Sequence, residues 1–102
     1  MIILLSEVPI EPESREEAIQ IVKSMARVSR TEAGVIDYRV TTDLETPNTV
    51  RIIEQYEDSD AVEAHESSDH LETFQRDIEP HVAADPELYR YDVTAQTEME
   101  GP

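Results

Sequence analysis

The chain of 102 residues has no cysteine and only two glycines, Gly34 and Gly101. Without cysteine it has no disulfide framework, no thiol nucleophile and no thiolate metal site. Two isolated glycines cannot form a glycine-rich phosphate loop, so a nucleotide site of that kind is excluded. No serine lies in the sequence context of a nucleophile elbow. These absences remove several common enzyme classes.

Long apolar runs are also missing. The N-terminal run Met1–Leu5 has no basic segment before it and is too short for a signal peptide, and nothing approaches a membrane span. The length suits one domain. We therefore expect a single domain over residues 1–95, a polar and frayed tail over residues 96–102, and a soluble cytoplasmic protein.

Basic residues are scarce: eight stand against 24 acids, which gives a net charge of −16, and Lys23 is the one lysine. Nucleic acids and anionic membranes would be repelled, so neither is expected as a partner. The acids are dispersed along the chain rather than gathered in a tail. Dispersed acid with almost no lysine favours adaptation to high salt, where counter-ions relieve the self-repulsion. The pattern predicts a halophile protein whose thermal stability rises with salt.

Hydrophobic periodicity predicts the order β-α-β-β-α-β, with the second helical region broken at Ser67-Ser68. Ser14 and Glu17 have the spacing of a capping box before the first helix, and His81 lies beside Pro80 and is expected to face solvent. Strands are expected over residues 2–8, 35–42, 49–57 and 88–95, and helices over residues 15–32, 61–66 and from about 69 to Pro80 or Pro86.

This order is typical of the ferredoxin-like α+β fold, a four-stranded antiparallel sheet with helices on one face. The other face would still carry apolar residues, among them Ile3, Leu5 and Ile53. A second copy of the sheet is the simplest cover for them. We expect a homodimer that packs sheet to sheet.

Candidate chemistry concentrates in the stretch Glu54–His70. Tyr56 shares a strand face with Ile52 and Glu54, and this face would border a pocket between sheet and helices. His65 follows Ala61 by four residues, so both lie on one helical face, and an inward imidazole could act as a base or a donor. The sequence is equally consistent with Tyr56 as a core residue and with His65 as a histidine that is hydrogen-bonded to a backbone carbonyl.

His70 comes five positions after His65, which on one continuous helix would separate the two side chains by about 140°. A two-histidine metal site needs a spacing of four or a comparable convergence. The spacing therefore predicts no metal site, and His70 is interpreted as a residue of the next helix's first turn.

One set of short motifs resembles the antibiotic biosynthesis monooxygenase (ABM) domain, and the resemblance extends over nearly the whole chain. The motifs are Glu54-Gln55-Tyr56-Glu57, Ala61-Val62-Glu63-Ala64-His65, Ser68-Asp69-His70-Leu71 and Phe74. The resemblance implies ferredoxin-like homodimers that form an α+β barrel, with one pocket per subunit. It also implies one of three activities: cofactor-free oxygenation of quinols and polyketide phenols, haem degradation, or isomerisation of a phosphorylated sugar derivative.

Departures from the family pattern narrow this choice. The usual tryptophan before the acidic turn is Tyr56, and the usual proline before the second histidine is Asp69. The haem-degrading branch has an asparagine and a histidine where this chain has Ser6 and Arg76, which disfavours haem. The isomerase branch carries a tyrosine at the position of Tyr56, so an isomerase stays open.

The resemblance leads us to expect a cofactor-independent monooxygenase of quinol-like or phenolic substrates. Its alternatives are an isomerase of a small metabolite, phosphorylated or not, and a non-catalytic dimer that binds a small molecule. His65 would assist proton transfer and Tyr56 would donate to the developing oxyanion. The predicted catalytic residues are His65, Tyr56 and His70, the predicted substrate-binding residues are Ile52, Glu54, Phe74 and Ser6, and no metal or cofactor is expected.

Overall fold

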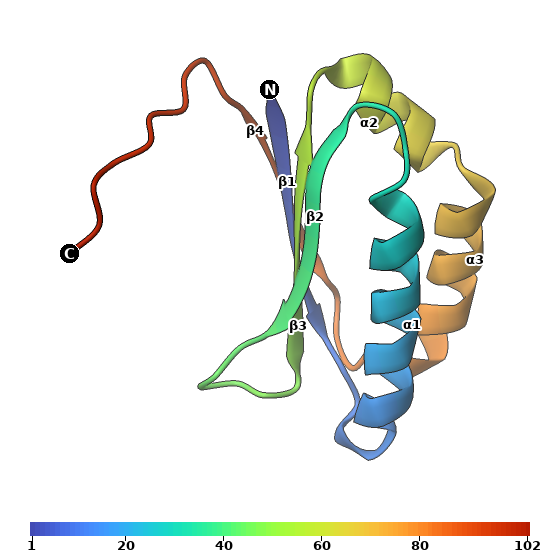
Figure 1. Cartoon of the computed structure of the whole chain (residues 1–102). Coiled ribbons are helices and arrows are strands. Elements are labelled where there is room, and N and C mark those ends of the chain that lie inside the picture. The colour runs from blue at the N-terminus through green and yellow to red at the C-terminus, as the bar shows by residue number, and fades with distance from the viewer.

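One four-stranded antiparallel sheet carries three α-helices on the same face (Figure 1). The computed structural model describes residues 1–102, the whole chain. The strand order across the sheet is β2-β3-β1-β4. Along the chain the elements are β1 (Ile2–Pro9), α1 (Arg15–Ser29), β2 (Val35–Thr42), β3 (Thr49–Tyr56), α2 (Ser59–Glu66), α3 (Asp69–Ile78) and β4 (Glu87–Asp92). The predicted ferredoxin-like α+β fold is confirmed.

The two central strands place alternate residues under the helices. β1 pairs with β3 so that Ser6 lies opposite Ile52 and Leu4 lies opposite Glu54. Every second residue of β3, from Val50 to Tyr56, is buried. Because side chains alternate between the faces of a strand, this register puts Glu54 and Tyr56 on the helix side, as the sequence predicts.

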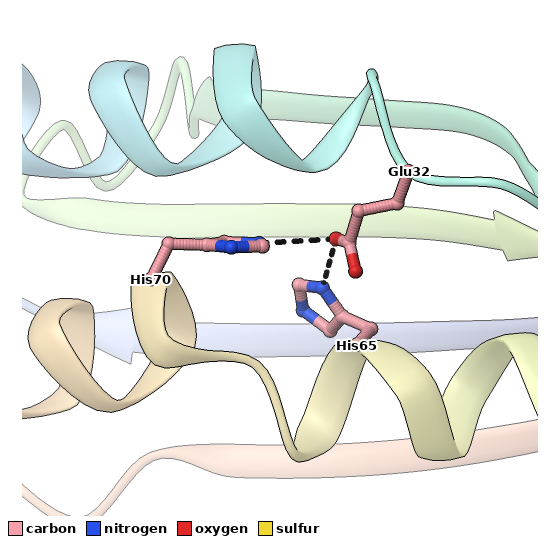
Figure 2. A group of neighbouring side chains, drawn as sticks. All are labelled: Glu32, His65 and His70. Atoms are coloured by element: carbon pink, nitrogen blue, oxygen red, sulfur yellow. Dashed lines mark hydrogen bonds and ion pairs between the residues drawn. The ribbon is translucent and has the colours of Figure 1, made fainter.

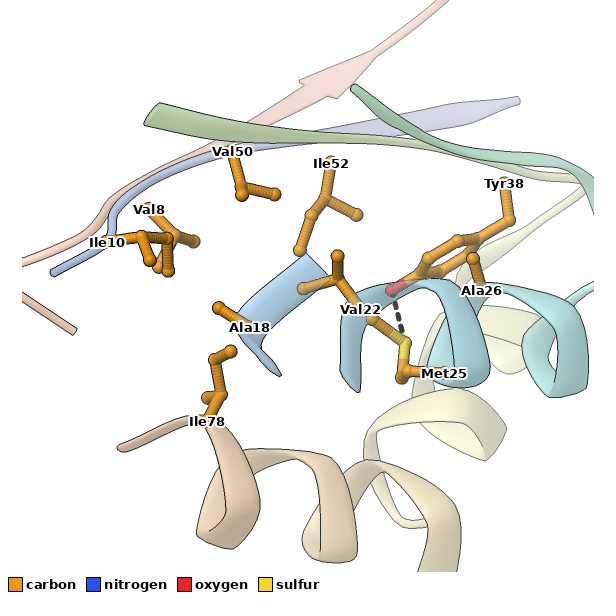
Figure 3. Packing of buried hydrophobic residues seen from close by; sticks show 10 residues of the cluster. All are labelled: Val8, Ile10, Ala18, Val22, Met25, Ala26, Tyr38, Val50, Ile52 and Ile78. Atoms are coloured by element: carbon orange, nitrogen blue, oxygen red, sulfur yellow. Dashed lines mark hydrogen bonds between the residues drawn. The ribbon is translucent and has the colours of Figure 1, made fainter. Parts of the chain in front are cut away.

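The core lies between this face and α1, and ten buried residues pack there (Figure 3). Tyr38 of β2 is 1% exposed, and its hydroxyl donates to the Met25 sulfur at 2.9 Å. Ala26 is fully buried, whereas Val28 is 44% exposed. Helical spacing alone would predict Val28 in the same buried stripe as Met25, and this is wrong, since α1 buries Ala26 instead.

The first helix begins at Arg15 as predicted, but its cap and its end differ from the prediction. Ser14 precedes α1 but its side chain makes no capping bond, so the predicted capping box is not formed. The reason is that Pro12–Ser14 form a 3-10 turn, and Ser14 has ψ of 20° rather than the extended backbone of a capping residue. The helix ends at Ser29 and not at residue 32, which leaves Glu32 in the following turn.

The predicted break between the second and third helices is confirmed. Asp58 caps α2 by accepting from the Ala61 amide at 2.9 Å, and Ser68 caps α3 by accepting from the Leu71 amide at 3.3 Å. α3 ends at Ile78, where a 3-10 turn begins. The chain thereby starts a new helix direction at Ser68.

His81 is not solvent-facing, contrary to the prediction, since its side chain is only 16% exposed. After α3 the chain returns to the end of β1, where Val82 bridges Ile10 and the His81 carbonyl accepts from the Glu11 amide at 2.8 Å. This return packs the 3-10 turn against the sheet and covers the imidazole.

The sheet face away from the helices carries apolar side chains. The register aligns Leu5 with Ile53 and Tyr89, and Ile3 with Tyr91. Ile53, Tyr89 and Tyr91 are 37%, 50% and 48% exposed. β4 ends at Asp92, earlier than predicted, and residues 96–102 are exposed without helix or strand. No helix combines the length and the apolar character needed to cross a membrane.

Candidate active site

A cavity of about 780 Å³ lies between the inner sheet face and the helices α2 and α3. Twelve of its twenty lining residues are hydrophobic, so its walls suit an apolar ring system. The size falls within the range of pockets that hold small organic ligands. The four predicted substrate-binding residues, Ser6, Ile52, Glu54 and Phe74, all line it.

His65 is the buried base candidate in this wall. The residue is 2% exposed and its ring contacts those of Tyr38 and Tyr56, with centroids 5.4 and 5.8 Å apart. Its Nδ1 lies 2.7 Å from Glu32 Oε1, and its Nε2 lies 3.8 Å from Glu54 Oε1. Nδ1 is therefore bonded to the Glu32 carboxylate, in the turn after α1, and Nε2 is directed toward Glu54, which lines the cavity.

Tyr56 does not line the cavity, although it was predicted to donate to the substrate. The residue has no exposed surface, and its hydroxyl donates to Glu54 Oε1 at 2.5 Å. Burial and the bond to Glu54 raise the pKa of Tyr56, so its proton stays in place. Burial also raises the pKa of Glu54, and the bond from Tyr56 opposes this only in part. Tyr56 therefore holds Glu54 rather than a ligand.

Tyr38 lines the cavity and was missed as a site residue. Burial, followed by the nearby charge of Glu54, raises the pKa of its hydroxyl. The strand alternation in β2 would have placed Tyr38 inward, but its distance from the Glu54–His70 stretch along the chain gave no reason to connect the two.

His65 and His70 meet through one carboxylate oxygen, which Figure 2 shows. Glu32 Oε1 lies 2.7 Å from His65 Nδ1 and 3.1 Å from His70 Nε2. The expected separation of the two histidines assumed one continuous helix, and the break at Ser67-Ser68 removes that assumption. Ser68 fixes the corner by donating to the His65 carbonyl at 2.6 Å.

Glu32, which the sequence reading missed, completes the one group of three side chains able to hold a metal ion. The ligand atoms of Glu32, His65 and His70 all lie within 4.8 Å of one another. His70 does not border the main cavity but lines a second hollow of about 380 Å³ between α1 and α3. The only sequence signal for Glu32 was its place in the turn before Gly34.

The charges around the cavity are mainly negative. Glu54, Glu66 and Glu79 line it, against the single cation Arg90. Arg90 already bonds to Asp92, at 3.1 Å, and to Ser59, at 3.2 Å. Arg51 lies on the opposite sheet face, paired with Glu7 and Asp43, and does not line the cavity. The cavity is thus poorly equipped for a phosphorylated ligand.

Residues 1–77 match the family described as "Antibiotic biosynthesis monooxygenase". The chain belongs to the antibiotic biosynthesis monooxygenase (ABM) family. A Bacillus subtilis protein named "Putative monooxygenase YcnE" is 30% identical over 74 residues, which cover 72% of this chain and 78% of that protein. Both the family and this relative carry the name of a monooxygenase.

Solved structures share the fold of this ABM protein. One from Bacteroides thetaiotaomicron, described as a "putative antibiotic biosynthesis monooxygenase", is 29% identical with a TM-score of 0.83 and covers 97% of this chain and 95% of that one. Another with the same description, from Deinococcus radiodurans, has a TM-score of 0.92 at 20% identity, covering 99% and 100% of the two chains. Proteins of the ABM family are typically dimeric.

Proposed function

We propose that this ABM protein is a cofactor-independent monooxygenase of a quinol-like or phenolic small molecule, bound in the 780 Å³ cavity. The observation that carries the proposal is the pairing of Glu32 with His65 in the wall of this largely apolar cavity. A buried imidazole tied at one nitrogen to a carboxylate is the arrangement of a general base.

Glu32 would fix the tautomer of His65. A carboxylate only accepts hydrogen bonds, so its contact with Nδ1 places the imidazole proton on that nitrogen. Neutral His65 then has its lone pair on Nε2, the nitrogen directed toward Glu54 and the cavity. Nε2 would take the phenolic proton of the substrate.

The resulting electron-rich anion can reduce dioxygen without a cofactor. For a hydroquinone the balanced reaction is diol plus O₂ to hydroxyquinone plus water. A carbon–oxygen bond forms at the ring, the O–O bond breaks, and the second oxygen leaves as water with protons from the substrate. All of the electrons come from the substrate, so the protein's tasks are binding, deprotonation and exclusion of water.

Glu54 and Tyr56 would set the charge at the inner end of the cavity. The raised pKa of Glu54 makes this carboxyl easier to protonate than an exposed one, and a neutral carboxyl tolerates an anionic ring nearby. Tyr56 orients it through the 2.5 Å bond. We therefore assign Tyr56 a positioning role, while Phe74 and Ile52 supply apolar walls.

The two alternatives have less support. An isomerase of a phosphorylated metabolite would need cations at the ligand, and the cavity offers Arg90 against three glutamates. A dimer that binds a small molecule without turnover would show ligand binding and no oxygen consumption.

Oxygen uptake with a panel of quinols tests the proposal. We expect His65→Gln to lower kcat by about 10²–10⁴-fold, the usual contribution of general base catalysis. His81→Gln is the matched control, because His81 lies outside the cavity lining and the ion pair of its imidazole is with Glu17, at 3.9 Å. Uptake no faster than spontaneous autoxidation, or equal kcat values for the two variants, would contradict the proposal.

A further inference from the structure

We propose that Glu32, His65 and His70 form a binding site for a divalent transition-metal ion of the zinc type. The carboxylate comes from the turn after α1, and the two imidazoles come from the end of α2 and the start of α3 (Figure 2). Three elements thus deliver three donor groups to one point.

The donor atoms are already near the separations that one ion requires. Bonds of about 2.0–2.2 Å to a tetrahedral ion leave its donors roughly 3–3.5 Å apart. Glu32 Oε1 is 2.7 Å from His65 Nδ1 and 3.1 Å from His70 Nε2, and all three ligand atoms lie within 4.8 Å. The side chain of His70 is 25% exposed, so its ring can turn toward His65 without disturbing the core.

The donor chemistry also fits. Two imidazoles and a carboxylate are a common protein ligand set for zinc and its neighbours in the first transition row. The remaining nitrogen of His65 lies 3.8 Å from the Glu54 carboxylate, the kind of outer carboxylate that supports a metal-binding histidine. The hollow beside His70 leaves access for the ion and for a water ligand. The net charge of −16 favours the approach of a cation.

Occupancy would oppose the proposed oxygenation, and this step of the inference rests on the proposed function. An ion bound at His65 Nδ1 takes the lone pair of that nitrogen, so neutral His65 must carry its proton on Nε2. His65 could then donate to a ligand in the cavity but could not accept a phenolic proton. The site is thus an inhibitory one, in keeping with a cofactor-free reaction.

Calorimetric titration of the untagged protein with Zn²⁺ tests the site directly. Excess Mg²⁺, which prefers oxygen ligands, and molar KCl suppress loose binding to the many surface carboxylates. We expect one Zn²⁺ per chain, with affinity lowered at least ~100-fold in Glu32→Gln and His70→Gln. His81→Gln is again the control and should bind like the wild-type protein. Both altered ligands lie outside the buried core, and circular dichroism checks that the variants fold.

Co²⁺ provides a second readout that does not depend on activity. Co²⁺ held by imidazoles in a four- or five-coordinate site absorbs strongly in the visible, whereas Co²⁺ held by carboxylates and water absorbs weakly. The strong band should appear in the wild-type and His81→Gln proteins and be lost in His70→Gln. No stoichiometric Zn²⁺ binding, or equal affinity in His70→Gln and His81→Gln, would overturn the site.

Inhibition is then measured as oxygen uptake with and without one equivalent of Zn²⁺. Each protein is compared with its own metal-free rate: a large fractional loss on adding Zn²⁺ to the wild-type protein, and little or no fractional loss in His70→Gln, would support the inhibitory role. Full activity with Zn²⁺ bound would overturn that role. Binding and spectra are recorded without substrate, so they decide the metal site even if the oxygenase proposal fails.

Discussion

Gly34 links the α1–β2 turn to α2 at the point where the Glu32 turn approaches His65. Its φ is +82°, and a Cβ atom there would lie 2.6 Å from the Ala61 side chain. Backbone in this region costs an L-residue about 1–2 kcal/mol, and overpacking adds about 1–3 kcal/mol. We expect Gly34→Ala to lower the free energy of unfolding by about 2–5 kcal/mol, measured by urea denaturation.

The control for this prediction is the double variant Gly34→Ala, Ala61→Gly, compared with Ala61→Gly alone. Removing the Ala61 methyl group relieves the clash but leaves the backbone cost. The two substitutions should therefore couple favourably, by about 1–3 kcal/mol. Additive effects would mean that the close approach of Gly34 and Ala61 does not occur in solution.

The bond between Tyr56 and Glu54 gives a second prediction at this scale. Tyr56→Phe leaves a buried carboxyl without its donor, which should cost about 1–3 kcal/mol of unfolding free energy. Tyr38→Phe is the matched control, since Tyr38 is equally buried but donates to the neutral Met25 sulfur. A loss for Tyr56→Phe no larger than for Tyr38→Phe, in the same urea titration, would argue against the assigned bond.

Individual site residues differed in how well the sequence could predict them. Strand alternation correctly put Glu54 on the helix side, and helical spacing put His65 inward. Neither rule could show that the Tyr56 hydroxyl donates to Glu54, because that depends on which polar group lies nearest in the buried layer. The role of Glu32 could not be predicted from the sequence, since its contact with His65 joins residues 33 positions apart through tertiary packing.

Among the elements, the turn between β2 and β3 is organised by Asp43. Its carboxylate accepts from the amides of Glu45 and Thr46, at 2.8 and 3.1 Å, and from Arg51 at 2.8 Å. The Glu45 amide above all, followed by Arg51 and the Thr46 amide, lowers the pKa of Asp43 from 3.8 to about 2.

A lowered carboxyl pKa means that the unfolded chain binds the proton more readily than the native chain. Asp43 therefore stabilises the native state fully above pH ~4, and this contribution is lost as pH falls toward ~2. Asp43→Asn should flatten the pH dependence of the melting temperature over this interval. Glu45→Gln, in the same turn, is the control and should keep it. Parallel curves for Asp43→Asn and the wild-type protein would refute the assignment.

The bounds of helices and strands were predicted correctly where local chemistry determines them. β2 was predicted to the residue, and the break between α2 and α3 followed from the residue types at Ser67-Ser68. The capping box at Ser14 failed because the preceding Pro12 favours a tight turn that takes Ser14 out of the extended conformation. The expected separation of His65 and His70 was wrong for a related reason, since spacing along one helix says nothing about the angle between two helices.

For the whole molecule, the apolar face opposite the helices predicts self-association. Ile53 lies in the middle of this face beside Leu5, and the family is typically dimeric. We expect a homodimer in sedimentation velocity, and Ile53→Glu should shift it to a monomer because a carboxylate would be buried at the contact. Leu44→Glu is the control: Leu44 is 98% exposed in the β2–β3 turn and outside the face. A monomeric wild-type protein would contradict the sheet-to-sheet dimer.

The dispersed acidic surface gives the second prediction at this scale. Screening shortens from about 10 Å at 0.1 M salt to about 3 Å at 1 M, so self-repulsion should fade over this interval. We expect the melting temperature to rise by several degrees with KCl. Replacing exposed Glu63, Glu72 and Glu98 by lysine should reduce that slope. Equal slopes, or none, would contradict adaptation to high salt.

The Ser67-Ser68 connection between α2 and α3 limits the insertions and deletions that the sequence can tolerate. Ser67 alone separates the last residue of α2 from Ser68, which caps α3 and also donates to the His65 carbonyl, so a residue added or deleted here would shift α3 relative to α2. Leu71, Phe74 and Ile78 would leave the positions they occupy in the cavity wall. Exposed positions on α3 can accept many substitutions, while the length of this connection cannot vary. In this stretch the position of α3 depends on the number of residues in the connection more than on their identity.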